Sequence, residues 1–269
     1  MVQNLIKIDR EIKKVKKRVS ANQSANYLTH CCTKLIYLFE ILENMSFTPR
    51  YFIEDISYLK INSKKIAIPM VCFCDIPLVR EKTHLENYGY FGLALKKQWG
   101  INNKLQKITY VTNNSHLLKD IHCAFEFAMN YKGKEDITPL TNNILTLIQY
   151  LKPIVGNQKN AMNELKKIWF TDDCEWRFVS NDELLECIID NGMTEEEYEE
   201  YIKNINIVIA EDTKLAKLKF DIDDIEYIIV DTIDSVFELK RYFTDKNLEQ
   251  RFEQLVTKII IWDNIKEVI

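Results

Sequence analysis

The chain has 269 residues, of which 46% are hydrophobic, 28% charged and 11% aromatic, and its net charge is −4. This is the mix of an ordinary globular protein, so it excludes an intrinsically disordered, a collagen-like or a coiled-coil chain. The net charge also excludes a general nucleic-acid coat. No apolar run reaches the roughly 18 residues that a membrane helix needs, so we expect no membrane contact.

The first segment is strongly basic. Residues 1–19 carry seven Lys or Arg against two acids, and their apolar positions form a narrow stripe. We therefore predict a basic amphipathic helix over residues 1–25, which either packs on the main body or contacts a partner. The segment lacks the uninterrupted apolar core and cleavage site of a secretory signal. We expect a cytoplasmic protein whose seven cysteines are free thiols.

The segment up to residue 111 mixes strands and helices. A short strand is predicted at 26–29, and a helix follows because Leu35, Leu38, Phe39 and Leu42 repeat with helical spacing. Extended segments are predicted at 47–53, 66–77, 88–95 and 107–111, with a short helix at 78–87. Within the apolar run 66–77, Pro69 is expected to interrupt the strand.

The second half begins with helices over 115–151, separated at Pro139. The next segment predicts a hairpin of 167–170 with 174–179. Residues 181–203 form a predicted acidic helical insert. Strands at 215–220, 226–230 and 258–262 alternate with helices at 234–242 and 246–256. With no repeat or linker, the pattern favours one α+β domain over 26–269, with helical insertions at about 113–152 and 181–204.

Two early residues are candidates for ligand binding. His30 ends a strand just before a helix, where an imidazole can hydrogen-bond a ligand in a cleft. Arg50 lies in an extended segment, and a guanidinium is suited to grip a diphosphate. The alternatives are a half-buried His satisfied by the backbone, and a surface salt bridge from Arg50 to Glu54 or Asp55.

The strand around TDDCEWRFV has one polar face. Strand alternation places Asp173, Glu175 and Arg177 on one face and bulky apolar residues on the other. Carboxylates in a cleft can hold a sugar hydroxyl and stabilise a developing positive charge. The alternative is an ordinary solvated strand face.

Other kinds of site find little support. Cys31 and Cys32 are adjacent and point opposite ways on a strand, and Cys72 and Cys74 lie in an apolar run, so we expect buried thiols and no metal. No signature supports a Ser-His-Asp or Cys-His triad. Neither a phosphate-binding loop nor a dinucleotide-binding glycine motif is present.

The order of these segments resembles the AbiGi family of two-gene abortive-infection systems, which protect bacteria against phage. The resemblance covers roughly residues 26–262. It rests most on PMVCFCDIPL (69–78) and YGYFGLALKKQWG (88–100), together with the His-x-x-Thr strand end at His30 and the Glu-Trp-Arg-Phe-Val strand at 175–179. More distantly, the His, Arg and Glu positions resemble the ADP-ribosyltransferase fold, including DarT-like enzymes that modify nucleic acid.

The second resemblance implies a split antiparallel β-sheet with flanking and inserted helices, which clamps NAD as a substrate. It implies that Glu175 is the catalytic carboxylate, with Asp173 two residues earlier where many such enzymes have Gln or Glu. It implies NAD-binding roles for His30, Thr33, Arg50, Asp75, Tyr88 and Tyr90. The short Asp173 and the Cys pair after His30 are departures from the family pattern that leave room for a non-catalytic copy.

The resemblances imply a component of a phage-defence, toxin–antitoxin-like system with a cognate second protein. One hypothesis is an NAD-dependent ADP-ribosyltransferase, whose Glu175→Gln variant loses transfer while it still folds. The alternative is a non-catalytic antitoxin or regulatory module. A nucleic-acid target requires a basic groove beside Glu175, for which Lys96, Lys97, Lys104 and Lys107 are candidates, although a solvated face explains them equally well.

Overall fold

A computed structural model describes residues 24–159, 162, 164–180, 185–212 and 215–267. The predicted basic helix at 1–25 therefore lies outside the described residues, except for the last two. The strands are β1 (Tyr27–Cys32), β2 (Ser46–Phe47), β3 (Arg50–Asp55), β4 (Lys65–Cys74), β5 (Phe91–Lys96), β6 (Gln106–Lys107), β7 (Thr109–Val111), β8 (Leu151–Pro153), β9 (Val155–Lys159), β10 (Leu165–Trp169), β11 (Glu175–Val179), β12 (Ile188–Ile189), β13 (Leu218–Lys219), β14 (Ile225–Val230) and β15 (Ile259–Ile261). The α-helices are α2 (Leu35–Asn44), α3 (Lys82–Tyr88), α4 (Lys97–Asn102), α5 (His116–Asn130), α6 (Thr138–Gln149), α7 (Glu195–Glu211), α8 (Ile233–Asp245), α9 (Glu249–Leu255) and α10 (Trp262–Ile265).

A mixed β-sheet runs through the molecule. Its strand order is β15-β14-β5-β1-β4-β11-β6, and both β3 and β12 also pair with β4. Most neighbours are antiparallel, but β14 and β15 are parallel. The prediction of an α+β fold is confirmed. The predicted sheet was a split antiparallel one, whereas the observed sheet is mixed because β14 and β15 are parallel. Among the described helices, none is long and apolar enough to cross a membrane.

Strand β4 is the long central strand, and it runs unbroken through Pro69. The predicted interruption was therefore wrong. In the register, Pro69 lies opposite Tyr51 of β3. The backbone N–H and C=O of Tyr51 bond to the side chain of Asn206 and so make no bond to β4. The N–H that proline lacks is not needed at this pair, and the strand continues.

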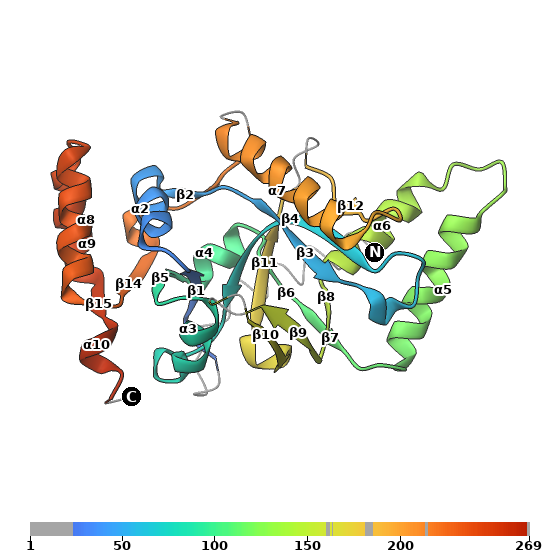
Figure 1. Cartoon of the computed structure of the whole chain (residues 1–269), viewed down its shortest axis with the longest axis horizontal. Coiled ribbons are helices and arrows are strands. Elements are labelled where there is room, and N and C mark those ends of the chain that lie inside the picture. The colour runs from blue at the N-terminus through green and yellow to red at the C-terminus, as the bar shows by residue number, and fades with distance from the viewer. Residues whose placement is uncertain (1–23, 160–161, 163, 181–184, 213–214, 268–269) are drawn as a thin grey trace, which may run out of the picture.

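Helices cover the sheet at both ends (Figure 1). At one end, α2, α8 and α9 pack their apolar stripes on β1, β5 and β14, in a core that includes Leu38, Leu93 and Phe243. At the other end, α5 and α6 pack on β4 through Ile121 and Ile148. The prediction of two helices separated near Pro139 is confirmed, because Pro139 lies in the first turn of α6.

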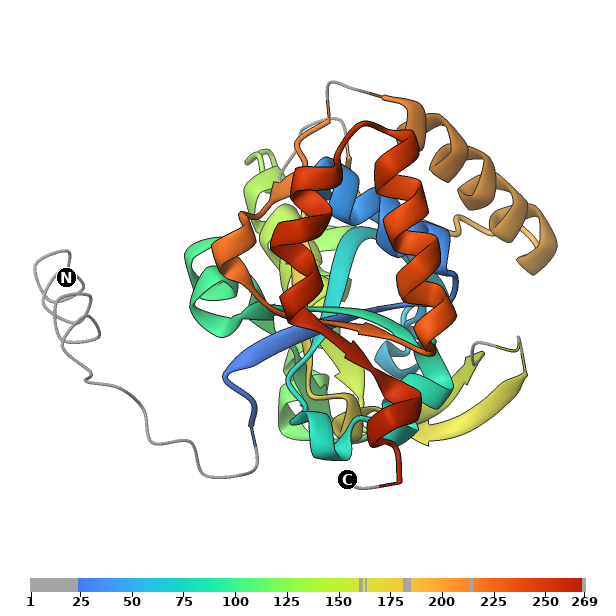
Figure 2. The same ribbon diagram turned by 90° about the vertical axis from the view of Figure 1, so that its left-hand side faces the viewer.

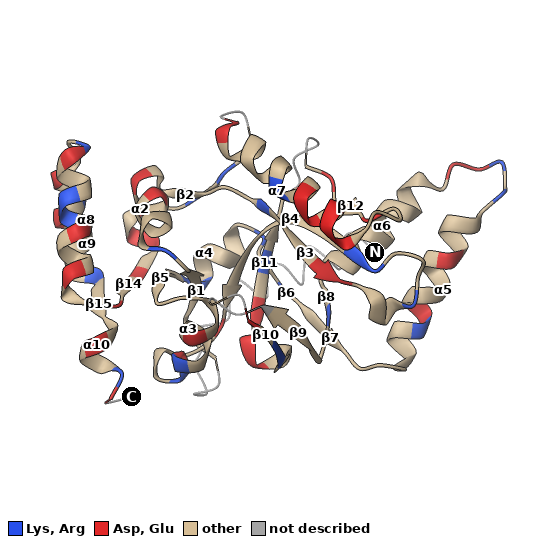
Figure 3. Cartoon of the chain, viewed as in Figure 1, with Lys and Arg blue, Asp and Glu red and all other residues tan. Residues whose placement is uncertain are grey.

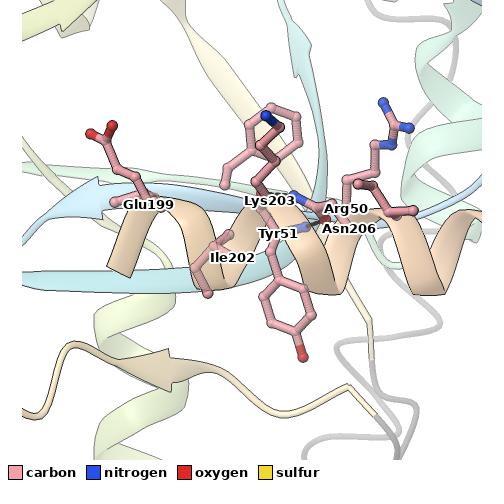
Figure 4. A pocket seen from close by; sticks show the side chains of 9 residues that line it. Arg50, Tyr51, Glu199, Ile202, Lys203 and Asn206 are labelled. Atoms are coloured by element: carbon pink, nitrogen blue, oxygen red, sulfur yellow. Dashed lines mark hydrogen bonds between the residues drawn. The ribbon is translucent and has the colours of Figure 1, made fainter. Parts of the chain in front are cut away.

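The acidic insert forms a single helix that starts later than predicted. Residues Ile188–Ile189 form β12, and α7 then begins behind a Thr194–Glu197 capping box. Figure 3 shows, in red, that acidic residues occupy the first turns of α7. The helix lies against the outer edge of β3, where Asn206 accepts from the N–H of Tyr51 at 2.8 Å and donates to its C=O at 2.9 Å. Beside this contact, a groove of about 450 Å³ runs between β3 and α7 (Figure 4).

The predicted hairpin was wrong in its pairing. Strand β10 pairs with β9, whereas β11 pairs with β4 and β6. Between β10 and β11, Phe170–Asp173 form a 3₁₀ turn and Cys174 takes a left-handed φ of 45°, which redirects the chain into the sheet. Residues Thr171–Asp173 do form the predicted turn. The chain after the turn pairs with the apolar β4, which has β3 on its other side, and not with β10.

Candidate functional site

The sheet is split beside β4. On one side of this strand, β3 pairs with Lys65–Met70, and β1 pairs at Thr29 with Cys74. Within the described strands, the stretch between Met70 and Cys74 has no strand partner on that side. The carbonyl of Cys72 in this gap is satisfied by a side chain, because His30 Nδ1 lies 2.8 Å from it. A cavity opens where the two strands diverge.

This cavity has a volume of about 970 Å³ and collects most of the predicted site residues. It is lined by His30 of β1 and Thr33 just after that strand, by Arg50 of β3, by Tyr88 of α3, and by Asp173 and Glu175. Residues far apart in the chain therefore converge on one hollow. Such a volume is within the range of ligand pockets.

Glu175 lies in a buried network of four charges. Arg177 Nε donates to its Oε1 at 2.5 Å, and Lys152 Nζ donates to its Oε2 at 3.1 Å. Glu54 Oε1 accepts a hydrogen bond from the Arg177 guanidinium at 2.9 Å and lies 3.6 Å from Lys152 Nζ. Burial acts to raise the pKa of Glu175, but the two cations outweigh it and hold the pKa well below its usual range. The carboxylate is anionic, and each of its oxygens is held by a cation.

The polar face predicted for this strand is buried. Glu175 and Arg177 point to one side, and the opposite residues Trp176 and Phe178 pack against the core. The anchoring role predicted for the bulky face is thus correct, and the solvated-face alternative is wrong. Asp173 precedes the strand in the 3₁₀ turn, yet it lines the same cavity as Glu175.

His30 is a neutral imidazole with a defined tautomer. Burial lowers its pKa, against a smaller opposing effect of the backbone bond to Cys72. A carbonyl only accepts, so Nδ1 carries the proton, and Nε2 is left as a hydrogen-bond acceptor. In the cavity, His30 therefore offers an acceptor to a ligand N–H or O–H.

A second polar group lies at the other wall of the cavity. The Tyr88 hydroxyl donates to Asp173 Oδ2 at 2.7 Å, and the His84 ring lies 4.3 Å from the Tyr88 ring. Burial lowers the pKa of His84, but Cys74 and Asp173 outweigh this effect and raise the pKa to about 10. A cationic His84 thus neighbours Asp173 at 3.4 Å.

Arg50 and Thr33 are both exposed and line the cavity. The Arg50 guanidinium carbon lies 6.0 Å from the Tyr37 ring centroid. The alternative of a salt bridge from Arg50 to Glu54 or Asp55 is not seen among the described residues, since Glu54 pairs with Arg177 and Lys152. An exposed guanidinium at this place is available to an anionic ligand.

Two of the predicted ligand-binding residues lie away from the cavity. Asp75 is buried in an ion pair with Lys97 at 2.6 Å and also accepts from the N–H of Ala25 at 2.9 Å. Tyr90 is 38% exposed, beyond the turn at Gly89, and does not line the hollow. Lys97, a candidate for a basic groove, is likewise committed to Asp75, whereas Lys107 is exposed on β6.

Sequence reasoning missed three charged residues of the site: Glu54, His84 and Lys152. Lys152 lies in a three-residue strand, and no sequence motif surrounds it. Only the structure identifies it as a site residue, through its burial and its contacts with two carboxylates. The cysteines are free thiols, and the described residues contain no metal-binding group of His, Cys, Asp and Glu.

Comparison of the sequence with known proteins identifies the family. A family model described as "Putative abortive phage resistance protein AbiGi, antitoxin" matches residues 45–231. The chain is also 34% identical over 252 residues to "Abortive phage resistance protein AbiGi" of Lactococcus lactis subsp. cremoris, and the match covers 83% of this chain and 99% of that protein. The chain belongs to the AbiGi family. No solved structure matches, so the likeness of this AbiGi protein to ADP-ribosyltransferases stays a prediction.

Proposed function

We propose that this AbiGi protein is the antitoxin of a two-gene abortive-infection system. Its membership of a family described as an antitoxin, over residues 45–231, carries this proposal. The site agrees with a non-catalytic role, because each oxygen of Glu175 is occupied by a buried cation of the same chain. A carboxylate held in this way stabilises the fold around the cavity before any ligand is present.

Expression in a bacterial host tests the antitoxin role. The cognate second protein, expressed alone, is expected to arrest growth, and co-expression of this chain is expected to restore it. This chain alone should be harmless. Growth arrest by this chain alone contradicts the antitoxin proposal. Loss of that arrest in Arg50→Ala, which changes an exposed residue of the cavity, favours the enzyme.

The second candidate is an NAD-dependent ADP-ribosyltransferase, which the convergence of His30, Arg50 and Glu175 on one cavity favours. In this hypothesis Arg50 binds the diphosphate, and His30 Nε2 accepts a hydrogen bond from the ligand. Glu175 accepts from the ribose 2′-hydroxyl and stabilises the positive charge that develops as nicotinamide leaves. A nucleophile of the protein or nucleic-acid target then attacks the anomeric carbon.

Calorimetric titration with NAD tests this candidate. Because Arg50 is exposed, Arg50→Ala should keep the fold and weaken NAD binding at least about tenfold, as expected for the loss of a charged contact. The matched control is Arg80→Ala, which removes an exposed arginine away from the cavity. Absence of NAD binding, or equal effects of the two changes, removes NAD from the proposal. Release of nicotinamide distinguishes transfer from binding alone.

A further inference from the structure

The β9–β10 hairpin projects from the body of the molecule (Figure 2, yellow). Strand β10 pairs with β9, and no other described strand pairs with it. One edge of β10 is therefore open. An open strand edge presents unpaired N–H and C=O groups that another strand can use.

The register shows which residues face the open edge. The N–H of Phe170 donates to the C=O of Ile154 at 2.9 Å, and the pairing continues with Lys167 opposite Asn157. In an antiparallel pair, hydrogen-bonded positions alternate, so Phe170 and Ile168 point their backbone groups to β9. The backbone groups of Leu165, Lys167 and Trp169 then point outward, and the described residues supply no hydrogen-bond partner for them.

The same three residues carry exposed side chains. Trp169 is 61% exposed and Leu165 is 67% exposed, and Lys167 between them is exposed too. Alternation places all three on one face of the strand. Large exposed aromatic and aliphatic side chains beside an open edge are typical of a protein-binding strand.

We propose that the open edge of β10 docks the cognate partner protein by addition of one of its strands. This inference rests on the proposed antitoxin function. The partner strand has apolar residues that cover Leu165 and Trp169, and an acidic residue that faces Lys167. A second copy of this chain fits poorly, because antiparallel pairing of two β10 edges about Lys167 sets the two lysines opposite each other.

A proline at the central outward position tests the backbone contact directly. In Lys167→Pro, the lost N–H is one that points away from β9, so the hairpin keeps its own hydrogen bonds. The matched control Lys167→Ala removes the charge and keeps the N–H. Trp169→Ala removes the largest exposed anchor. Each full-length variant is checked by thermal unfolding before use.

Affinity for the purified partner, measured by calorimetry, is the readout. We expect Lys167→Pro to weaken binding at least about tenfold and Trp169→Ala about thirtyfold, as for an interface hot spot. Lys167→Ala should weaken it less than about threefold.

The two proposals fail in different ways. If the wild-type chain neither binds nor neutralises the partner, the proposed function fails. If the wild type binds and both Lys167→Pro and Trp169→Ala bind equally well, the docking strand is refuted and the function stands. Binding of a single-stranded oligonucleotide that Trp169→Ala abolishes, or a dimer that Lys167→Pro dissociates, also overturns the assignment.

Discussion

The Nζ atom of Lys152 lies 3.1 Å from Oε2 of Glu175, and both side chains are buried at the cavity. Lys152→Met leaves Glu175 and Glu54 with Arg177 as their one remaining cation in the described network. We expect the variant to lose about 3 kcal/mol of unfolding free energy, as when one partner of a buried pair is removed. Denaturant unfolding measures the loss.

The control for Lys152 is Lys166→Met, because Lys166 pairs with Glu164 at 3.5 Å in an exposed position. That change should cost less than about 0.5 kcal/mol. Equal losses in the two variants contradict a structural role for the buried network. By the same reasoning, Glu175→Gln should also destabilise the protein, whereas the sequence alone suggested intact folding.

The burial of Glu81 is expected to make the stability of the protein depend on pH. Burial raises its pKa from 4.5 to about 7, although the hydroxyl of Thr29 donates to Oε1 at 2.8 Å. The pKa of Glu81 is higher in the folded than in the unfolded state. Its contribution to the free energy of unfolding is therefore fully present below the unfolded-state pKa and is lost as pH rises through about 7. The loss from this group is about 3 kcal/mol.

The measurement is denaturant unfolding at pH values between 5 and 8. Glu81→Gln, which does not ionise, should flatten the profile and be more stable than the wild type at pH 8. An unchanged slope in that variant assigns the pH dependence to other groups.

Asn206 is expected to protect the outer edge of β3. Asn206→Ala leaves the backbone N–H and C=O of Tyr51 without the partners that they have at 2.8 and 2.9 Å. The expected cost is about 1–3 kcal/mol, together with faster hydrogen exchange at the Tyr51 amide. Asn204→Ala, an exposed position on the same helix, is the control. If the Tyr51 amide exchanges equally fast in both variants, the contact does not protect the edge.

Asp75 should act on stability and not on the cavity ligand. Asp75→Asn removes the buried carboxylate charge that pairs with Lys97 at 2.6 Å, for a loss of about 3 kcal/mol in denaturant unfolding. Affinity for NAD should stay within about twofold of the wild type, since Asp75 does not line the cavity. A larger change in affinity restores Asp75 as a ligand-binding residue.

The sequence predicted local structure better than strand pairing. Helical spacing in α2 and the Pro139 boundary were read correctly because these signals are local. The partner of β11 could not be read, because pairing is decided by the sheet as a whole. Pro69 misled for the same reason, since its tolerance depends on its register opposite Tyr51 of β3, where the pair makes no ladder hydrogen bond.

The candidate site was predictable where a motif carried it. His30, Arg50 and Glu175 were named from their segments and lie at one cavity, but their roles stay predictions. Lys152 and His84 had no signal because only the fold brings them to the carboxylates. Asp75 lies outside the cavity lining, because this motif acid forms a buried ion pair with Lys97.

Trp169 and Phe170 are neighbours in the chain, yet their side chains point in opposite directions. Trp169 faces solvent, whereas the ring of Phe170 lies 4.3 Å from Nζ of Lys152. One peptide bond thus joins the outer surface of the hairpin to the charges that hold Glu175. Binding at the two places is then reciprocal. If a small molecule in the cavity changes the affinity for a second protein by some factor, that protein changes the affinity for the small molecule by the same factor.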